Sequence, residues 1–234
     1  MQREKPVNNE IYHVYNRGVE KRKIFLTEND YLRFLHDLYE FNDTAPAVYF
    51  HKKPQHFKSC EVGLRKVAQK RDLLVEIYSF TLMPNHFHLM LKQIREGGVT
   101  EFMRKIGTGY TNYFNLTQER VGSLFQGKYK SVRIDNHAHF LHLPFYIHSN
   151  PLSLEFSDWQ EKGIDADEAI KFLESYKWSS FCDYASKKNF PSVISKDFLT
   201  EIIGEPTKFK KEFKKWLDDF DKNKSKIEPY LLEK

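Results

Sequence analysis

The segment from Leu73 to Gln93, LLVEIYSFTLMPNHFHLMLKQ, places the tightest limit on what this 234-residue chain can fold into. Its first half is a nearly continuous apolar run, which is typical of a central strand with both faces covered. The tripeptide Met83-Pro84-Asn85 interrupts the run. Beyond it the residues alternate, so that Phe87 points to one face of a second strand while His86 and His88 point to the other. The segment therefore predicts two adjacent strands with two imidazoles on one face.

The composition indicates a folded protein of the cytoplasm. Hydrophobic residues make up 40% of the chain, and the formal net charge of +5 permits a nucleic-acid partner without requiring one. No apolar run of about 18 residues could span a membrane, and the polar start MQREKPVNNE does not have the pattern of a signal peptide. The chain has only two cysteines, which is too few for a disulfide framework or a zinc site of CxxC type. We therefore expect a soluble cytoplasmic protein without a membrane partner.

The remaining periodicities predict an α+β fold. Strands are expected at residues 10–16 and in the second half of 122–135, and helices at about 28–41, 100–116 and 136–150. This order of elements is typical of a ferredoxin- or RRM-like antiparallel sheet with helices on one face. The opposite face would then be open to His86 and His88. Pro144 costs about 3 kcal/mol inside a helix, so the third helix is expected either to kink there or to begin later.

Two regions are set apart by their composition. We expect residues 1–154 to form one domain, in which 42–72 is an insertion with a short helix near 60–70, and 155–234 to form a C-terminal helical appendage. The appendage should contain a helix near 165–176 and one or two amphipathic helices within 195–220. His51 and His56 lie in the insertion and are not expected to bind a metal.

His86 and His88 form a recognisable half-site for a divalent ion, because two neutral imidazoles at positions i and i+2 of a strand leave the same face. A third ligand would have to come from elsewhere in the chain. The alternative is that both histidines are simply exposed on a solvated sheet face.

Two further features are compatible with nucleic acid. Lys128, Lys130 and Arg133 are interleaved with Tyr129 on an extended segment, which suits contacts with phosphates and unstacked bases. An edge strand protected by its charges would have the same pattern. Gly107, inside the second predicted helix, costs roughly 1 kcal/mol relative to alanine. A close approach by another backbone or by a nucleic-acid strand would explain it, and so would local fraying.

The stretch LMPNHFHL at residues 82–89 closely resembles the His-hydrophobic-His signature of the HUH single-strand endonucleases. More narrowly, it resembles the Y1 transposases of the IS200-like and REP-associated tyrosine transposase group. Other stretches agree with this group in the same order and extend the resemblance over about residues 10–184: YHVYNRG at 12–18, Ile24-Phe25, 122–130, YIHSNP at 146–151 and WSS at 178–180.

The resemblance implies a role for specific residues. His86 and His88 would hold Mg²⁺ or Mn²⁺, and Tyr146 would be the nucleophile that forms a 5′-phosphotyrosine link with single-stranded DNA at a hairpin or repeat. Asn150, one helical turn after Tyr146, would be the third metal ligand or would orient the tyrosine. His148 lies on another face of the helix and is not a preferred ligand. The candidate DNA contacts are Arg17, Lys128, Lys130 and Arg133.

Other interpretations stay open at this stage. The same sheet and basic strand could serve a non-catalytic protein that binds structured single-stranded nucleic acid, and a metal hydrolase of small phosphates would use water in place of Tyr146. IS200-like enzymes are typically shorter dimers, whereas the REP-associated group tends to carry additional C-terminal sequence. The long C-terminal region favours the second group, so the protein is expected to be either a monomer or a homodimer.

Overall fold

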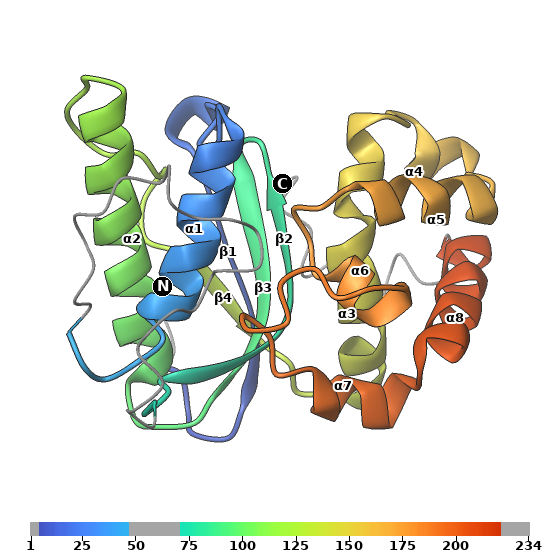
Figure 1. Cartoon of the computed structure of the whole chain (residues 1–234). Coiled ribbons are helices and arrows are strands. Elements are labelled where there is room, and N and C mark those ends of the chain that lie inside the picture. Colours follow the sequence, from blue (N-terminus) through green and yellow to red (C-terminus); the bar gives the residue numbers. More distant parts are fainter. Residues whose placement is uncertain (1–4, 47–70, 221–234) are drawn as a thin grey trace.

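The computed structural model describes residues 5–46 and 71–220, and in it four strands form one antiparallel sheet (Figure 1). The strands are β1 (Ile11–Arg17), β2 (Val75–Met83), β3 (His86–Gln93) and β4 (Lys130–Arg133). Their order in the sheet is β2-β3-β1-β4. A long helix of the described residues lies between β1 and β2 and another between β3 and β4, which confirms the predicted ferredoxin-like arrangement. Most of the expected insertion, including its short helix and its two histidines, lies outside the described residues.

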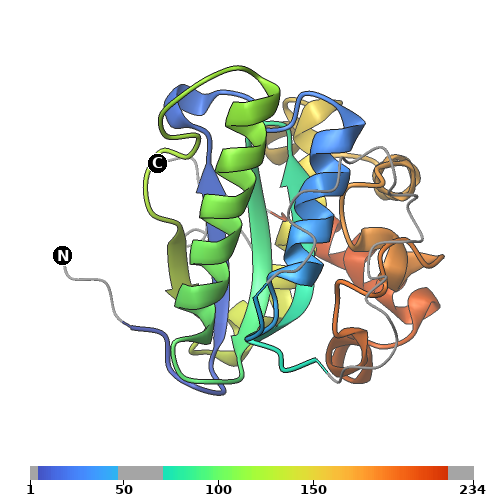
Figure 2. The same cartoon turned by 60° about the vertical axis from the view of Figure 1, so that its left-hand side comes forward.

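Two long helices cover one face of the sheet, as predicted (Figure 2). They are α1 (Glu28–Glu40) and α2 (Gly98–Thr117), which also pack against each other. Thr27 caps α1 together with Asp30, whose carboxylate accepts the Thr27 backbone N–H at 2.8 Å. The ring of Phe34 on α1 lies 5.0 Å from that of Phe87. The apolar set of β3 therefore points to this face, and the two histidines of β3 to the other.

Helix α2 begins two residues before the predicted start at Thr100, and glycine packing explains the difference. A β-carbon at Gly98 would lie 2.3 Å from the carbonyl oxygen of Leu74, so the first turn of the helix needs glycine at this position. The backbone N–H of Val99 donates to the side-chain oxygen of Gln93 at 3.1 Å. A side chain from β3 therefore satisfies a backbone donor of the first turn.

The opposite face of the sheet is not open, contrary to the expectation from a one-sided helix layer. Helix α3 (His137–Ser149) packs on it against β2 and β3. Asn136 caps its N-terminus, and the side chain of this residue accepts the N–H of His139 at 2.8 Å. It is continuous through Pro144, so it does not start later than that proline.

The C-terminal region is helical, as predicted, and packs around α3, with α7 also in contact with β2 (Figure 1). After the short 3₁₀ segments η1 (Val19–Lys21) and η3 (Asn150–Leu154), the remaining elements are α4 (Trp159–Lys162), α5 (Ala166–Ser175), α6 (Phe181–Ala185), α7 (Lys196–Ile203) and α8 (Pro206–Asp218). Of the one or two helices predicted within 195–220, the structure has two, α7 and α8. No helix in the described parts of the chain is long and apolar enough to cross a membrane.

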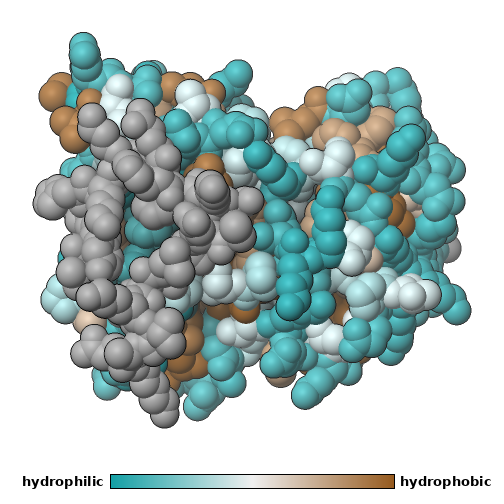
Figure 3. Space-filling model, viewed as in Figure 1, coloured by the Kyte–Doolittle hydropathy of each residue, from teal (hydrophilic) through white to brown (hydrophobic). Residues whose placement is uncertain are grey.

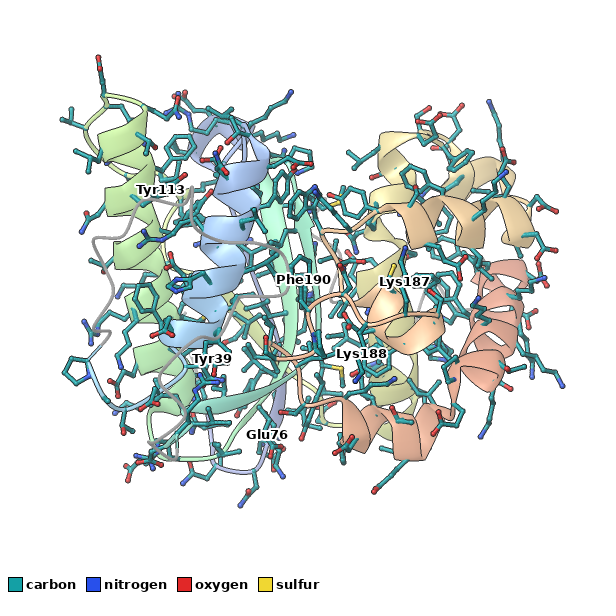
Figure 4. The ribbon with its side chains drawn as sticks, viewed as in Figure 1. Tyr39, Glu76, Tyr113, Lys187, Lys188 and Phe190 are labelled. Atoms are coloured by element: carbon teal, nitrogen blue, oxygen red, sulfur yellow. The ribbon has the colours of Figure 1, made fainter. Side chains whose placement is uncertain are left out.

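The appendage is joined to the sheet along β2. The N–H of Leu82 donates to the carbonyl of Trp178 at 2.9 Å, and the N–H of Ser180 donates to that of Phe80 at 3.0 Å. The buried ring of Phe190 fills the seam between the sheet and the C-terminal helices (Figure 4). Outside the grey residues, the face shown in Figure 3 is largely hydrophilic with scattered apolar atoms. The core of the sheet thus continues into the packing of the appendage.

Candidate active site

The predicted nucleophile and the predicted metal ligands lie together between β3 and α3. The ring centroid of Tyr146 is 5.7 Å from that of His88, with the rings nearly perpendicular at 85°. The centroids of His86 and His88 are 5.1 Å apart. His88 is fully buried, Tyr146 is buried with 5% exposure, and His86 is half-buried. The alternative of two histidines on a solvated sheet face is therefore wrong, because α3 covers that face.

A third histidine, which the sequence motifs did not single out, completes the cluster. Nε2 of His13 on β1 lies 2.8 Å from Nδ1 of His88, and the two rings are stacked with their planes 12° apart. His13 is fully buried, and its ring meets that of Tyr146 edge-on at 6.1 Å. The strand pattern of residues 10–16 predicts which face His13 occupies, but only the register of the strands places it beside His88. His13 lies on the same face of β1 as Tyr15, the residue paired with His88.

Burial keeps these imidazoles neutral. It lowers the pKa of His13 to about 3 and that of His86 to about 4. It also places the pKa of His88 well below its ordinary value, and the neighbouring imidazoles of His13 and His86 add to this effect. A neutral imidazole is the form that binds a metal ion. The cluster is therefore in the metal-binding protonation state at pH 7.

Asn150 is brought to the same cluster. Its side-chain amide donates to the carbonyl oxygen of Tyr146 at 2.8 Å. A side-chain hydrogen bond with Asn150 also favours the charged form of His86, although the desolvation that lowers the pKa is larger. Nδ1 of His86 lies 2.7 Å from Oδ1 of Asn85. Asn150 therefore contacts both the helix of the nucleophile and one of the histidines.

The donor atoms of this cluster fit a divalent ion. Nδ1 of His88 is engaged by His13, and its buried Nε2 has no hydrogen-bond partner among the described residues. Within the same residues, no group of three or more His, Cys, Asp or Glu side chains is arranged to hold a metal. Two imidazoles and the amide oxygen of Asn150 would form an incomplete coordination shell, which leaves positions for water or a phosphate oxygen.

His148 points away from the cluster, in agreement with the sequence. Its Nε2 lies 2.8 Å from the hydroxyl of Ser180, and the ring packs among Phe181, Tyr184 and Phe209 of the C-terminal helices. Burial lowers its pKa to about 3. His148 is therefore a packing residue between α3 and the appendage.

Three of the four basic candidates gather beside the cluster. Arg17, Lys128 and Lys130 line one small polar pocket of about 170 Å³ together with Tyr15. Lys130 pairs with Tyr15 in the sheet, so its side chain leaves on the face of His88. Lys128 precedes the strand, because β4 begins only at Lys130. Arg133 pairs with Tyr12 and leaves on the opposite face, so the structure separates it from the other three.

Comparison with known proteins identifies similar sequences and a similar fold. A family model described as "Transposase IS200 like" matches residues 52–150, a range that contains both histidines of β3, Tyr146 and Asn150. A solved structure of a REP-associated tyrosine transposase bound to a REP hairpin is similar with a TM-score of 0.50 and 14% sequence identity. The similarity covers 84% of this chain and 92% of that one. The search of curated proteins found no match. The predicted resemblance is thereby confirmed: residues 52–150 match the family model of IS200-like transposases, and the fold is similar to that of a REP-associated tyrosine transposase.

Proposed function

We propose that this protein is a metal-dependent endonuclease and strand transferase of single-stranded DNA that acts through a 5′-phosphotyrosine intermediate. The observation that carries the proposal is the convergence of Tyr146, from α3, on His86 and His88, from β3, with ring centroids of Tyr146 and His88 5.7 Å apart. A residue with the chemistry of a nucleophile and two with the chemistry of metal ligands, from two separate parts of the sequence, thus share one site.

The residues of the chain have distinct tasks in this reaction. The phenol oxygen of Tyr146 attacks the phosphorus of the scissile phosphodiester, the bond to the 3′-oxygen breaks, and the phenol proton balances the 3′-hydroxyl that is released. His86 and His88, assisted by Asn150, would hold Mg²⁺ or Mn²⁺. When bound, the ion polarises the phosphate and offsets charge in the transition state. The link to Tyr146 stores the energy of the broken bond for rejoining to another 3′-hydroxyl.

His13 supports His88 in this arrangement. When Nε2 of His88 is a metal ligand, it carries no proton, so its Nδ1–H donates to Nε2 of His13. This hydrogen bond fixes both the tautomer and the orientation of the ligand ring. His13 is thus a positioning residue: it orients His88 and does not itself bind the metal.

Hairpin DNA is the proposed substrate. The similar solved structure contains a REP hairpin, and Arg17, Lys128 and Lys130 provide positive charge next to the histidines. Phosphate contacts from such side chains position a strand without reading its sequence. We therefore propose that the strand beside the hairpin passes over these residues toward Tyr146.

A labelled hairpin oligonucleotide with single-stranded flanks, incubated with the protein and Mn²⁺, tests the proposal. We expect a labelled band at the mass of the protein on a denaturing gel, which is absent with EDTA and in Tyr146→Phe. DNA binding by Tyr146→Phe should be largely retained. Tyr39→Phe, on α1 at the other side of the sheet, is the matched control (Figure 4).

Two results would redirect the interpretation. Salt-sensitive binding without any adduct would favour the non-catalytic nucleic-acid-binding protein. Cleavage that persists in Tyr146→Phe would mean that water or another residue is the nucleophile.

A further inference from the structure

A second groove lies on the other side of the sheet from the histidines, between α2 and the loop 123–129. We call it the α2 groove. It has a volume of about 500 Å³, within the range of about 300–1,000 Å³ that is usual for ligand pockets. Arg104 and Gly107 line it from α2, and Phe125, Lys128 and Tyr129 line it from the loop side. Among these residues, only Lys128 has been given a role above, as a DNA contact.

The lining of the α2 groove has the chemistry of a nucleotide site. Its charged lining residues, Lys5, Arg104 and Lys128, are all basic, and no carboxylate side chain is among the lining residues. Aromatic surface is supplied by Tyr129, which is half-buried, and by Phe87 and Phe125, which also line the groove. Cations beside aromatic rings bind single-stranded nucleic acid by contacting the phosphates while a base stacks.

The groove connects to the active-site face. Asn16, Gly127 and Lys128 line both the α2 groove and the small polar pocket that contains Arg17 and Lys130. The two sites can connect because β4 pairs only with Tyr12–Tyr15. The last two residues of β1 therefore extend beyond the end of β4. The loop crosses there, held by the hydrogen bond from the Asn16 amide to the carbonyl of Gly127 at 3.0 Å. One strand of DNA could therefore pass from the histidines around this end of β1 into the groove.

The packing around Gly107 also leaves room for a DNA strand in the α2 groove. It lies inside α2, where glycine weakens a helix, yet a β-carbon at this position would meet nothing within 4 Å among the described residues. Protein packing in the described structure therefore does not require glycine here. Because Gly107 has no side chain to project into the groove, a ligand can approach the backbone of α2 there.

We propose that the α2 groove binds an unpaired nucleotide of the DNA strand whose neighbouring phosphodiester enters the active site. The identity of the ligand as DNA rests on the proposed function. The base lies against Tyr129, and Arg104 and Lys128 contact the phosphates on either side. The groove thereby sets how far from the hairpin the strand is held, and hence which phosphodiester reaches Tyr146.

Gly107→Leu tests this proposal, because it fills the groove with a residue that favours helix over glycine. The probes are a fluorescein-labelled hairpin with a single-stranded 5′ extension of about ten nucleotides and the same hairpin with a blunt end. Binding is measured in EDTA with the full chain. We expect Gly107→Leu to weaken binding of the extended hairpin about tenfold or more and to leave the blunt hairpin unaffected. Asn112→Leu, on the exposed side of α2, and Lys171→Ala, on α5, are controls.

Cross-linking gives a second measurement. With 5-iodouracil placed at successive positions of the extension, at least one position should link to the peptide that contains Tyr129, and Gly107→Leu should lose this link. Unchanged affinity of Gly107→Leu for the extended hairpin, or cross-links only to peptides outside the groove, would overturn the proposal.

The outcome is independent of catalysis. Adducts of Tyr146 are scored separately in Mn²⁺. If Gly107→Leu binds like the unmodified protein while adducts form, the groove has been misassigned and the proposed function stands. If Gly107→Leu loses affinity while the unmodified protein forms no adduct, the groove is a binding site and the catalytic proposal fails.

Discussion

The imidazoles of His13 and His88 are hydrogen-bonded to each other, Nε2 to Nδ1 at 2.8 Å, with both rings fully buried on adjacent strands. Because this contact engages one nitrogen of His88, the other is left for a ligand. We expect His13→Ala to weaken Mn²⁺ binding about 10- to 100-fold, as is typical for loss of a partner that orients a metal-ligating histidine. His13→Gln, which can still accept a hydrogen bond, should restore part of the affinity. Calorimetric titration with Mn²⁺ measures both, and equal affinity of His13→Ala and the unmodified protein would exclude the positioning role.

The two predicted roles of Asn150 can be separated by substitution. If its amide oxygen is a metal ligand, Asn150→Asp should increase Mn²⁺ affinity, because a carboxylate is a stronger oxygen donor, and Asn150→Ala should decrease it. If Asn150 only orients the helix of Tyr146 through its 2.8 Å hydrogen bond, both variants should bind Mn²⁺ normally and lose adduct formation alone. Mn²⁺ titration and adduct yield, measured on the same preparations, distinguish these cases.

Lys130 and Arg133 form a matched pair on β4, since both are exposed cations but leave opposite faces of the sheet. Lys130 lies on the face of the histidines, so Lys130→Ala should weaken hairpin binding and reduce the slope of log affinity against log salt by about 1. Arg133→Ala should change the slope much less. The measurement is binding over a series of salt concentrations. A larger effect of Arg133 would mean that the DNA follows the other face of β4.

His148 should make the protein less stable in acid. Its pKa is lowered to about 3 in the folded state, from about 6.5 in the unfolded chain. Between these values the unfolded state binds the additional proton, so the stabilisation present above about pH 6.5 is lost as the pH falls toward 3, by about 1.4 kcal/mol per pH unit. His148→Gln removes this contribution. Urea unfolding between about pH 7 and pH 5 should show a smaller loss for His148→Gln, and parallel curves would contradict the assignment.

The fold was predictable where local pattern determines structure. The alternation across Leu73–Gln93 and the helical periodicity of residues 28–41 placed two strands and α1 close to their observed bounds. The start of α2 was wrong by two residues because it depends on contacts of Gly98 with Leu74 and of Val99 with Gln93, which are formed only after the chain has folded. The face covered by α3 was missed for the same reason, since nothing in the periodicity of residues 136–150 says which side of the sheet receives the helix.

The site residues that belong to a recognisable sequence motif could be predicted. His86, His88, Tyr146 and Asn150 are named by short strings and do lie together, whereas their roles stay predictions. His13 was missed because a single histidine in a strand has no spacing pattern of its own, and its significance depends on the register that pairs Tyr15 with His88. The alternation along residues 128–134 already predicts that Arg133 leaves the face opposite Lys130, and the register of β4 confirms this.

The hydrogen bonds between β2 and residues 178–180 have a practical consequence for anyone who trims the chain. They occupy backbone groups on the outer edge of the sheet, and Tyr184 adds a bond from its hydroxyl to the carbonyl of Tyr78 at 2.6 Å. A version cut after η3 would retain every residue of the proposed chemistry but expose that edge as a bare strand. Such an edge invites pairing with other molecules, so the shortened enzyme should aggregate before its activity could be assessed.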